Sequence, residues 1–298
     1  ILSTRPDLLP APYIIELTKL LDAAPPVPVA EVIAIIEHEF GTGLSTQYAT
    51  FDEAPIASAS IGQVHRATLH DGTRVIVKVR RPGVERTIEA DLQLLVAQAR
   101  FLEGRSETLR RYHLVDIVDE FAQALRDELD YTIEGRNADR LRARVPDADV
   151  RIPIVHWDHT TRSVITQDEI VGIKLTERQR LLAAGYDLHS VAATLARAYL
   201  NQVFVHGIFH ADPHPANILV TGQQLGLVDF GVVGHLSPQV REGLGDLLYA
   251  LVEQSPDDMV HVITRLGAAN LTGDRDALRR AVQRLVTRYY DASLENLP

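Results

Sequence analysis

Apolar residues recur every three to four positions in two stretches near the start of the chain, 12–21 and 29–40. This spacing is typical of amphipathic helices, which turn one apolar face toward a core. The proline-rich segment 23–28 separates the two stretches, and proline interrupts a helix because it lacks a backbone N–H. The pattern therefore predicts a helical N-terminal extension over residues 1–48.

The pattern changes to short runs rich in β-branched residues after residue 55. Two of these runs, 61–68 and 73–79, flank Asp71-Gly72, a dipeptide typical of the tight turn in an antiparallel hairpin. The elements predicted next are helices at 84–103 and 114–144 and strands at 151–156 and 163–167. We therefore expect residues 49–168 to form a sheet-containing lobe that carries a helical insertion.

The second half of the chain is mainly helical in pattern. A strong helical period over 188–206 ends at Gly207, a residue type common at helix C-termini. The remaining predicted elements are strands at 218–220 and 225–228, joined by a turn at Thr221-Gly222, and helices from 238 to 290. Residues 169–298 are thus predicted to form a mostly helical lobe. The whole chain is predicted to be an α+β fold of two lobes with a cleft between them, and Glu169, at the junction, is a candidate to border a bound base.

The amino-acid composition excludes several classes of partner and site, and it does not change the predicted fold. The chain has 298 residues, 46% of them hydrophobic, no cysteine and a formal net charge of −10. Nucleic acid is not an expected partner, because non-specific binding to it depends on lysine and arginine. The lack of cysteine excludes disulfides and thiolate metal sites. We expect no membrane-spanning helix, since no apolar run approaches about 20 residues, and the start at Ile1 with a single methionine at Met259 suggests a fragment.

The polar residues that are candidates for catalysis are concentrated in the segment His210-Ala-Asp-Pro-His-Pro-Ala-Asn217, which is followed by Asp229-Phe-Gly231. Phosphoryl transfer in kinases uses one aspartate and one asparagine to hold magnesium, and a second aspartate to face the nucleophile. The spacing of Asp212, Asn217 and Asp229 fits those three roles. Asp-Phe-Gly alone would equally suit an ordinary exit from a strand, but its pairing with the upstream loop favours phosphate chemistry.

Two further features fit a nucleotide site. Lys78 lies in the alternating run Arg74-Val-Ile-Val-Lys78, from which its ammonium would leave the sheet toward phosphates. The ordinary alternative is a lysine that extends to solvent. The loop 55–64 stands where a protein kinase has a glycine-rich loop over the phosphates, but Gly62 is its single glycine. Its alanine Cβ atoms should hold the backbone farther from phosphates, unless the loop is simply a tight packing turn.

These motifs together resemble one family. Ala57-Ser-Ala-Ser-Ile-Gly-Gln-Val-His65, Val-Lys78-Val-Arg-Arg-Pro-Gly83 and His210-Ala-Asp-Pro-His-Pro are similar to the UbiB family of ABC1-type, or aarF-domain, kinase-like proteins. The resemblance covers nearly the whole chain, from Leu2 to beyond Asp229. It implies an atypical kinase-like protein tied to isoprenoid-quinone biosynthesis and lipid homeostasis, with ATP or ADP and magnesium as ligands.

The resemblance also assigns residues. The family's E-x-D motif matches Glu128-Leu-Asp130, and Glu134 looks like the carboxylate that pairs with Lys78, although locally these acids would suit an exposed helix. The family's inhibitory K-x-G-Q motif, placed directly before a segment resembling Leu2–Pro10, is not in this chain. The expected catalytic residues are Lys78, Asp212 and Asn217, and the expected metal ligands are Asn217 and Asp229. The expected nucleotide contacts are Ala57, Ser58, Ala59, Ser60, Val64, Lys78, Glu128, Asp130, Glu134 and Glu169.

The acceptor side of the site departs from protein kinases. Ala211 stands where protein kinases usually carry arginine, and the chain enters a helix near Pro238 without an Ala-Pro-Glu signature. These departures predict a small-molecule or lipid-linked acceptor, or water, rather than a protein. His206, His210 and His214 are spaced by four, but the glycine and prolines among them argue against a zinc-binding helix. We interpret His210 as a scaffold residue of the catalytic loop.

Three functions are compatible with these patterns. The leading hypothesis is an ATP-dependent kinase or ATPase that supports isoprenoid-lipid metabolism. The alternative is a nucleotide-gated pseudokinase or binding module that recruits lipids or biosynthetic enzymes, and catalytic turnover would separate the two. A third, an aminoglycoside- or choline-kinase-like enzyme, shares the acids but does not account for the loop 57–64. The resemblance implies a cytoplasmic protein that is peripheral to, or anchored at, the inner or plasma membrane, and the oligomeric state stays open.

Overall fold

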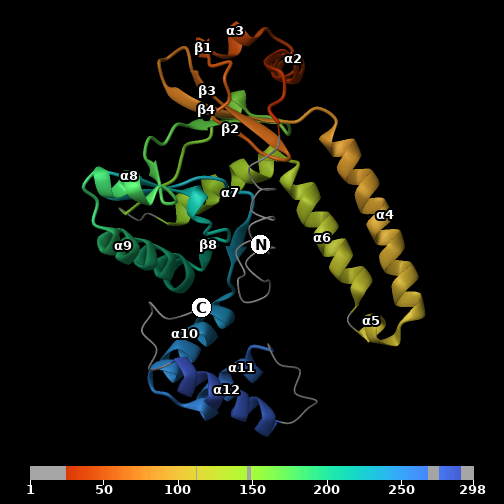
Figure 1. The fold of residues 1–298 in the computed structure, drawn as a ribbon, viewed down its shortest axis with the longest axis vertical. Helices are drawn as coiled ribbons and strands as arrows, with labels where there is room; N and C mark the ends of the chain where they lie inside the picture. Colours follow the sequence, from red (N-terminus) through yellow and green to blue (C-terminus); the bar gives the residue numbers. More distant parts are fainter. Residues whose placement is uncertain (1–24, 112, 146–148, 268–274, 290–298) are drawn as a thin grey trace.

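The chain folds into two lobes, from which a pair of helices projects (Figure 1). The computed structural model describes residues 25–111, 113–145, 149–267 and 275–289. The helix predicted at 12–21 lies outside the described residues. The helix predicted at 29–40 is present as α2 (Val29–Phe40), and the short α3 (Leu44–Gln47) follows it.

An antiparallel sheet forms the first lobe. Its strands are ordered β1-β3-β4-β6, and β2 pairs with β3. Their bounds are β1 Thr50–Phe51, β2 Ala57–Ser58, β3 Gly62–Thr68, β4 Arg74–Arg80 and β6 Val164–Asp168. The predicted hairpin is therefore present as β3 and β4, in a register that sets Val64 opposite Lys78. Gly72 in its turn has a φ of 87°, a conformation that glycine adopts without strain.

Alternation along β4 separates the core of this lobe from the site. Val75, Val77 and Val79 are buried in one apolar cluster with Val32 and Ile36 of α2. Successive side chains of a strand point to opposite faces, so Lys78 leaves the sheet by the other face. The helix α2 thus covers one face of the sheet, and the second face is left for Lys78.

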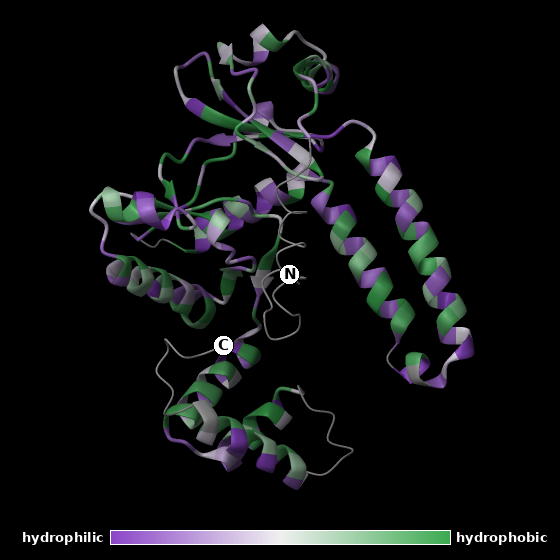
Figure 2. Cartoon of the chain, in the orientation of Figure 1, coloured by the Kyte–Doolittle hydropathy of each residue, from purple (hydrophilic) through white to green (hydrophobic). Residues whose placement is uncertain are grey.

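The helical insertion is an antiparallel pair joined at its far end by a short helix (Figure 1). The bounds are α4 Val84–Arg105, α5 Glu107–Arg111 and α6 Leu114–Glu128. The helix α4 packs along α6, and Leu92, Ala99, Val118 and Ala122 are their buried residues. Figure 2 shows apolar and polar positions alternating over the rest of both helices.

The helix predicted over 114–144 is wrong in one respect, because it is broken after Glu128 and restarts as α7 (Tyr131–Arg144). Asp130 begins α7: its Oδ1 accepts the Thr132 N–H at 3.0 Å, and its Oδ2 lies 3.0 Å from Arg162 Nε. The break lets α7 turn inward while α6 stays in the projecting pair (Figure 1).

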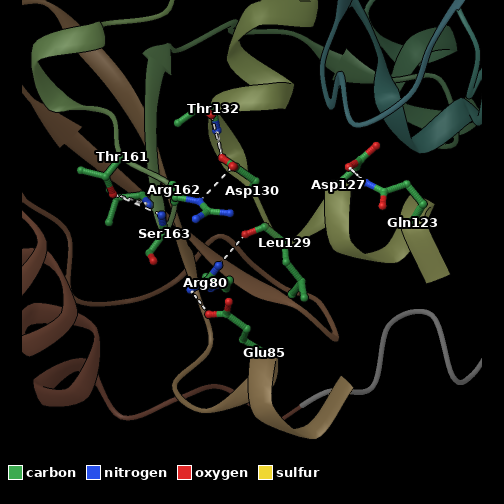
Figure 3. A network of polar contacts seen from close by, with 11 residues as sticks. Arg80, Glu85, Gln123, Asp127, Leu129, Asp130, Thr132, Thr161, Arg162 and Ser163 are labelled. Atoms are coloured by element: carbon green, nitrogen blue, oxygen red, sulfur yellow. Dashed lines mark hydrogen bonds and ion pairs between the residues drawn. The ribbon is translucent and has the colours of Figure 1, made fainter. Parts of the chain in front are cut away.

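One arginine fastens the base of the projecting pair, as Figure 3 shows. Arg80 donates to the Leu129 carbonyl at 2.6 Å, just after α6, and to Glu85 Oε2 at 2.9 Å, in the first turn of α4. Both ends of the insertion are therefore tied to the last residue of β4, two positions after Lys78.

The second lobe contains two small sheets and five of the helices that the structure describes. One sheet has the order β5-β10-β9-β7, and β8 pairs with β11 in the other. The strands are β5 Val150–Arg151, β7 Ile173–Lys174, β8 Ile208–His210, β9 Ile218–Thr221, β10 Gln224–Leu227 and β11 Val233–His235. The helices are α8 Arg178–Ala183, α9 Leu188–Leu200, α10 Pro238–Val252, α11 Pro256–Arg265 and α12 Arg275–Tyr289, with 3-10 turns at Trp157–His159 and Pro215–Asn217.

The strand predicted at 151–156 is shorter than expected and belongs to the other lobe. Only Val150–Arg151 is a strand, and it pairs in parallel with β10, although the predicted range of the first lobe, 49–168, includes it. Pro153 accounts for the early end, since proline cannot donate to a strand ladder. Farther along, Val155 makes an isolated bridge to Gln167 of β6, so the segment crosses between the sheets.

The helix α7 connects the lobes. Tyr131, Ala138 and Leu141 are buried in the apolar cluster of the second lobe, which also includes Ile165 of β6. The same helix contacts β6 of the first lobe and β8 of the second. Residues on α7 are therefore held between the two sheets. Among the helices that the structure describes, none is both long and apolar enough to cross a bilayer.

Candidate functional site

Three charged side chains that are remote in sequence meet at Lys78. Its Nζ lies 2.8 Å from Glu134 Oε2 on α7 and 3.7 Å from Asp229 Oδ2. The Lys78 ammonium also lies 5.1 Å from the ring centroid of Tyr131. The contact expected between Lys78 and Glu134 is therefore present, and Glu134 is buried rather than on an exposed helix.

Charge and burial together fix the ionisation of this cluster. Burial disfavours the Lys78 ammonium, but the carboxylates of Glu134 and Asp229 outweigh burial and raise the Lys78 pKa. The Lys78 charge lowers the pKa of Asp229. Burial raises the pKa of Glu134, an effect that Lys78 opposes. The lysine is thus a permanent cation, beside an Asp229 that is charged at neutral pH.

Asp229 is held in an uncommon backbone conformation. Its φ is 65°, a left-handed value that aspartate tolerates better than most residues. Phe230, next in the chain, is fully buried, packs edge-on against His210 at 5.3 Å, and its carbonyl accepts from Asn137 Nδ2 at 3.0 Å. These contacts hold the turn in place, so the Asp229 carboxylate faces Lys78 and not the core.

A buried histidine supports the loop that carries Asp212. His210 ends β8, its N–H donates to Gln202 Oε1 at 2.9 Å, and its Nδ1 accepts the Asp212 N–H at 3.3 Å. Gln202 belongs to a π-helix, Asn201–His206, that continues α9, so the helix predicted over 188–206 is present with a π ending. Such π segments occur often at functional sites. His210 therefore acts in the structure as a scaffold for this loop.

Asp212 and Asn217 face each other across the turn that joins them. Asn217 Nδ2 donates to Asp212 Oδ2 at 3.0 Å, which leaves the amide oxygen of Asn217 available as an acceptor. Glu128, at the end of α6, is close to the same group: partial burial raises its pKa, and the negative charges of Asp229 and Asp212 add to the effect. Carboxylates from three segments thus lie close enough for their charges to act on one another.

These oxygens suit magnesium. Magnesium is usually held by one or two protein carboxylates together with phosphate oxygens and water. Asp229 and Asn217 supply oxygen ligands of that kind, and the charge around Glu128 favours a cation. Within the described ranges, no three His, Asp or Glu side chains already form a metal-binding group.

The loop that precedes β3 pairs with one edge of β3, and the lysine strand β4 pairs with the other edge. Ala57 and Ser58 form β2, Ala59 and Ser60 form the turn, and Val64 in β3 is opposite Lys78 on the same face. Gly62 approaches Tyr131 so closely that a Cβ there would lie 2.1 Å from the Tyr131 Oη. Burial raises the pKa of that hydroxyl. A glycine is thus required for contact between the loop and α7.

Replacing Gly62 with alanine is expected to lower the free energy of unfolding by about 1–3 kcal/mol, the usual cost of overpacking. The added Cβ would also lie 3.1 Å from the Val79 carbonyl oxygen, so backbone as well as side chain must shift. Urea unfolding measures the effect. Gly104→Ala is the matched control, because open space surrounds Gly104 on α4; it should stabilise by up to about 1 kcal/mol. Equal midpoints for both variants would contradict the close approach.

Two expected nucleotide contacts have other partners. Both carboxylate oxygens of Asp130 are used, one by the N–H of Thr132 and one by Arg162. Glu169 lies 2.8 Å from Arg66 Nε and 2.7 Å from Arg74 Nη2, and its side chain is 7% exposed. Both side chains therefore form ion pairs in the first lobe, and the contacts of Asp130 and Glu169 with a nucleotide stay predictions.

Sequence reasoning missed three residues that shape the site. Tyr131 packs against Lys78 and Gly62, Asn137 holds the Phe230 carbonyl, and Gln202 holds His210. A signal existed for Asn137, which lies three positions after Glu134 and so shares its helix face. Gln202 offered none, because its inward position depends on the π-helix.

Comparison with known proteins agrees with this geometry. The profile of the ABC1 atypical kinase-like domain matches residues 19–263. The chain belongs to this family. It is 39% identical to the Arabidopsis thaliana protein Activity of BC1 Complex Kinase 8, chloroplastic, over 285 residues, which cover 93% of the chain and 37% of that protein. It is 38% identical to the probable protein kinase UbiB of Azotobacter vinelandii over 260 residues, which cover 85% of the chain and 48% of that protein.

A solved structure shares the fold of this ABC1-family chain. The Mycobacterium tuberculosis protein Rv3197, solved in complex with erythromycin, matches with a TM-score of 0.71 and 25% identity, covering 100% of this chain and 79% of that one. The α+β, two-lobed kinase-like fold predicted from the sequence is thereby confirmed. The chain spans about half, or less, of the length of the curated relatives it matches.

Proposed function

We propose that this ABC1-family chain binds Mg-ATP between its lobes and transfers the terminal phosphoryl group to a small molecule, an isoprenoid lipid or water. The observation that carries the proposal is the meeting of Lys78 with Glu134 at 2.8 Å and with Asp229 at 3.7 Å. The strand, helix and turn that supply these residues are far apart in sequence, and phosphoryl transfer requires this combination of lysine and carboxylates.

Each residue has a separate task in this mechanism. Lys78 orients the phosphates, and Glu134 holds Lys78 in place. Asp229 and the amide oxygen of Asn217 bind the metal, which when bound neutralises charge that develops on the phosphoryl oxygens. Asp212, held by Asn217 at 3.0 Å, orients the attacking hydroxyl or water. Catalysis of this kind comes mainly from position and charge.

The short segment after Gly231 favours an acceptor other than a protein. Only residues 232–237 separate Gly231 from α10, and Val233–His235 of that segment pairs with β8 as β11. No extended activation segment is therefore present to hold a peptide. The family resemblance points to isoprenoid-quinone or lipid metabolism, and a membrane surface is the corresponding place of action for the whole protein.

The test is Mg-dependent ATP binding and phosphate release by the purified chain, with and without isoprenoid-quinone precursors and anionic liposomes. Binding with turnover that these additions stimulate supports the proposal. Binding without turnover under any condition favours the alternative, a nucleotide-gated module, whose ligands would be the same residues. A lack of nucleotide binding contradicts both, and reproducible phosphopeptides from a cell lysate would contradict the proposed acceptor.

A further inference from the structure

One arginine makes most of the contacts that hold the loop 57–62. Arg81 directly follows β4, and its backbone N–H donates to the Ile61 carbonyl at 2.8 Å. Its side chain donates from Nε to the Ala59 carbonyl at 2.7 Å and from Nη2 to Ser58 Oγ at 2.8 Å. A single residue therefore bonds three positions of the loop.

The start of the loop is held by backbone pairing, because Ala57 and Ser58 pair with Val64 and Gln63 of β3. Its own turn is closed by the Ala59 N–H, which donates to the Gly62 carbonyl at 2.8 Å. Alanine and serine side chains are too small to anchor a loop by packing. A guanidinium is planar and presents its donors in a fixed fork, so it can fix several acceptors at once. The side chain of Arg81 adds bonds that tie the turn of this loop to the end of β4, three residues after Lys78.

The side chain of Arg81 donates to a hydroxyl and to two carbonyl oxygens. Among the residues that the structure describes, no carboxylate forms an ion pair with it. A cation without an acid partner favours nearby negative charge. The loop that it holds is the loop expected to lie over the phosphates.

The same side chain reaches the segment that precedes α2. Arg81 Nη2 also donates to the Pro25 carbonyl at 2.8 Å. Val27, two residues after Pro25, bonds to the buried side-chain amide of Gln63. The Val27 N–H donates to the Gln63 amide oxygen at 2.7 Å, and the Gln63 amide nitrogen donates to the Val27 carbonyl at 3.2 Å. Residues 25–27 are thus bonded to Arg81 and to β3, and they fix one side of the Arg81 guanidinium.

We propose that Arg81 is a positioning residue for the nucleotide. It fixes the turn of the Ala57–Gly62 loop, which is expected to lie over the phosphates, while residues 25–27 hold its guanidinium in the required direction. This inference rests on the proposed nucleotide site, but it assigns a role to a residue outside the lysine, carboxylate and asparagine set described above.

The experiment compares Arg81→Lys with the parent chain in titrations of ATP, ADP and adenosine, each with magnesium. Lysine keeps the charge and loses the fork, so the loop is no longer fixed. Affinity for ATP and ADP is expected to fall about tenfold, as for the loss of a charge-assisted hydrogen bond. Adenosine has no phosphates, so its affinity should not change. Arg86→Lys, exposed in the first turn of α4, is the matched control and should leave all three affinities unchanged.

The outcomes separate this inference from the proposed function. Unchanged affinity for ATP in Arg81→Lys, or an equal loss for adenosine, overturns the role of Arg81. Absence of ATP binding by the parent chain contradicts the nucleotide site itself. Should Arg81→Lys fail to fold, Arg81→Gln carries the same test, since its amide keeps a planar donor but loses the fork: a selective loss for ATP and ADP supports the role, and no loss overturns it.

Discussion

Magnesium-dependent ATP turnover is expected to fall at least about 100-fold when Asp229 is replaced with asparagine, because a bound metal supplies several kcal/mol of transition-state stabilisation. The substitution keeps the shape of the side chain but removes the charge that Lys78 holds ionised by lowering the Asp229 pKa. Asparagine also tolerates the left-handed backbone at this position, where φ is 65°, so the fold should be preserved.

The measurement is phosphate release as a function of magnesium concentration in the parent chain and in Asp229→Asn. Asp91→Asn, exposed on α4, is the matched control and should turn over like the parent. Thermal unfolding of each variant shows whether the fold is kept. Full turnover by Asp229→Asn at any magnesium concentration would remove Asp229 from the mechanism.

Replacing Lys78 with methionine is expected to lower the free energy of unfolding by about 3 kcal/mol at neutral pH, because it leaves Glu134 as a buried charge without its partner. The Glu134 side chain is 5% exposed, and the structure places Lys78 Nζ 2.8 Å from it. Burial raises the Glu134 pKa. Protonation of Glu134 therefore favours the folded state, and the deficit of the variant should shrink as the pH falls toward the carboxyl range.

Urea unfolding at several pH values measures this effect. Lys174→Met is the matched control, since Lys174 is exposed on β7, and its unfolding free energy should stay within about 0.5 kcal/mol of the parent. If Lys78→Met lowers the free energy of unfolding by the same amount at all pH values, the loss does not come from a buried, unpaired charge on Glu134. An unchanged stability would show that the pair is not buried as the structure places it.

The sequence predicted the parts of the site that depend on local pattern. Alternation along β4 was enough to place Lys78 on the face opposite the Val75, Val77 and Val79 core. The spacing of Asp212, Asn217 and Asp229 predicted a shared loop and turn, and the structure brings these residues to the same side as Lys78. The hydrophobic periodicity of a strand and the spacing of a motif depend on a short stretch of chain, so both can be recognised in the sequence without a structure.

Features that depend on distant partners could not be predicted. The segment 114–144 reads as one helix, and its break becomes evident only with Arg80 of β4 and Arg162 just before β6, which bind the Leu129 carbonyl and Asp130. β5 joins the second lobe through pairing with β10, about 75 residues later in the chain (225 − 150). Glu169 reads as a hinge residue near a base, yet Arg66 and Arg74 hold its carboxylate.

The most direct test of the central claim is reaction of the chain with an acyl-phosphate derivative of ATP, which acylates a lysine that lies beside bound phosphates. The lysines of the chain are Lys19, Lys78 and Lys174, so peptide mass spectrometry can assign the label. The account predicts labelling of Lys78 that excess Mg-ATP suppresses, with Lys174 unlabelled. Labelling of Lys78 that Mg-ATP does not suppress, or no labelling of Lys78, would contradict a nucleotide site built around it.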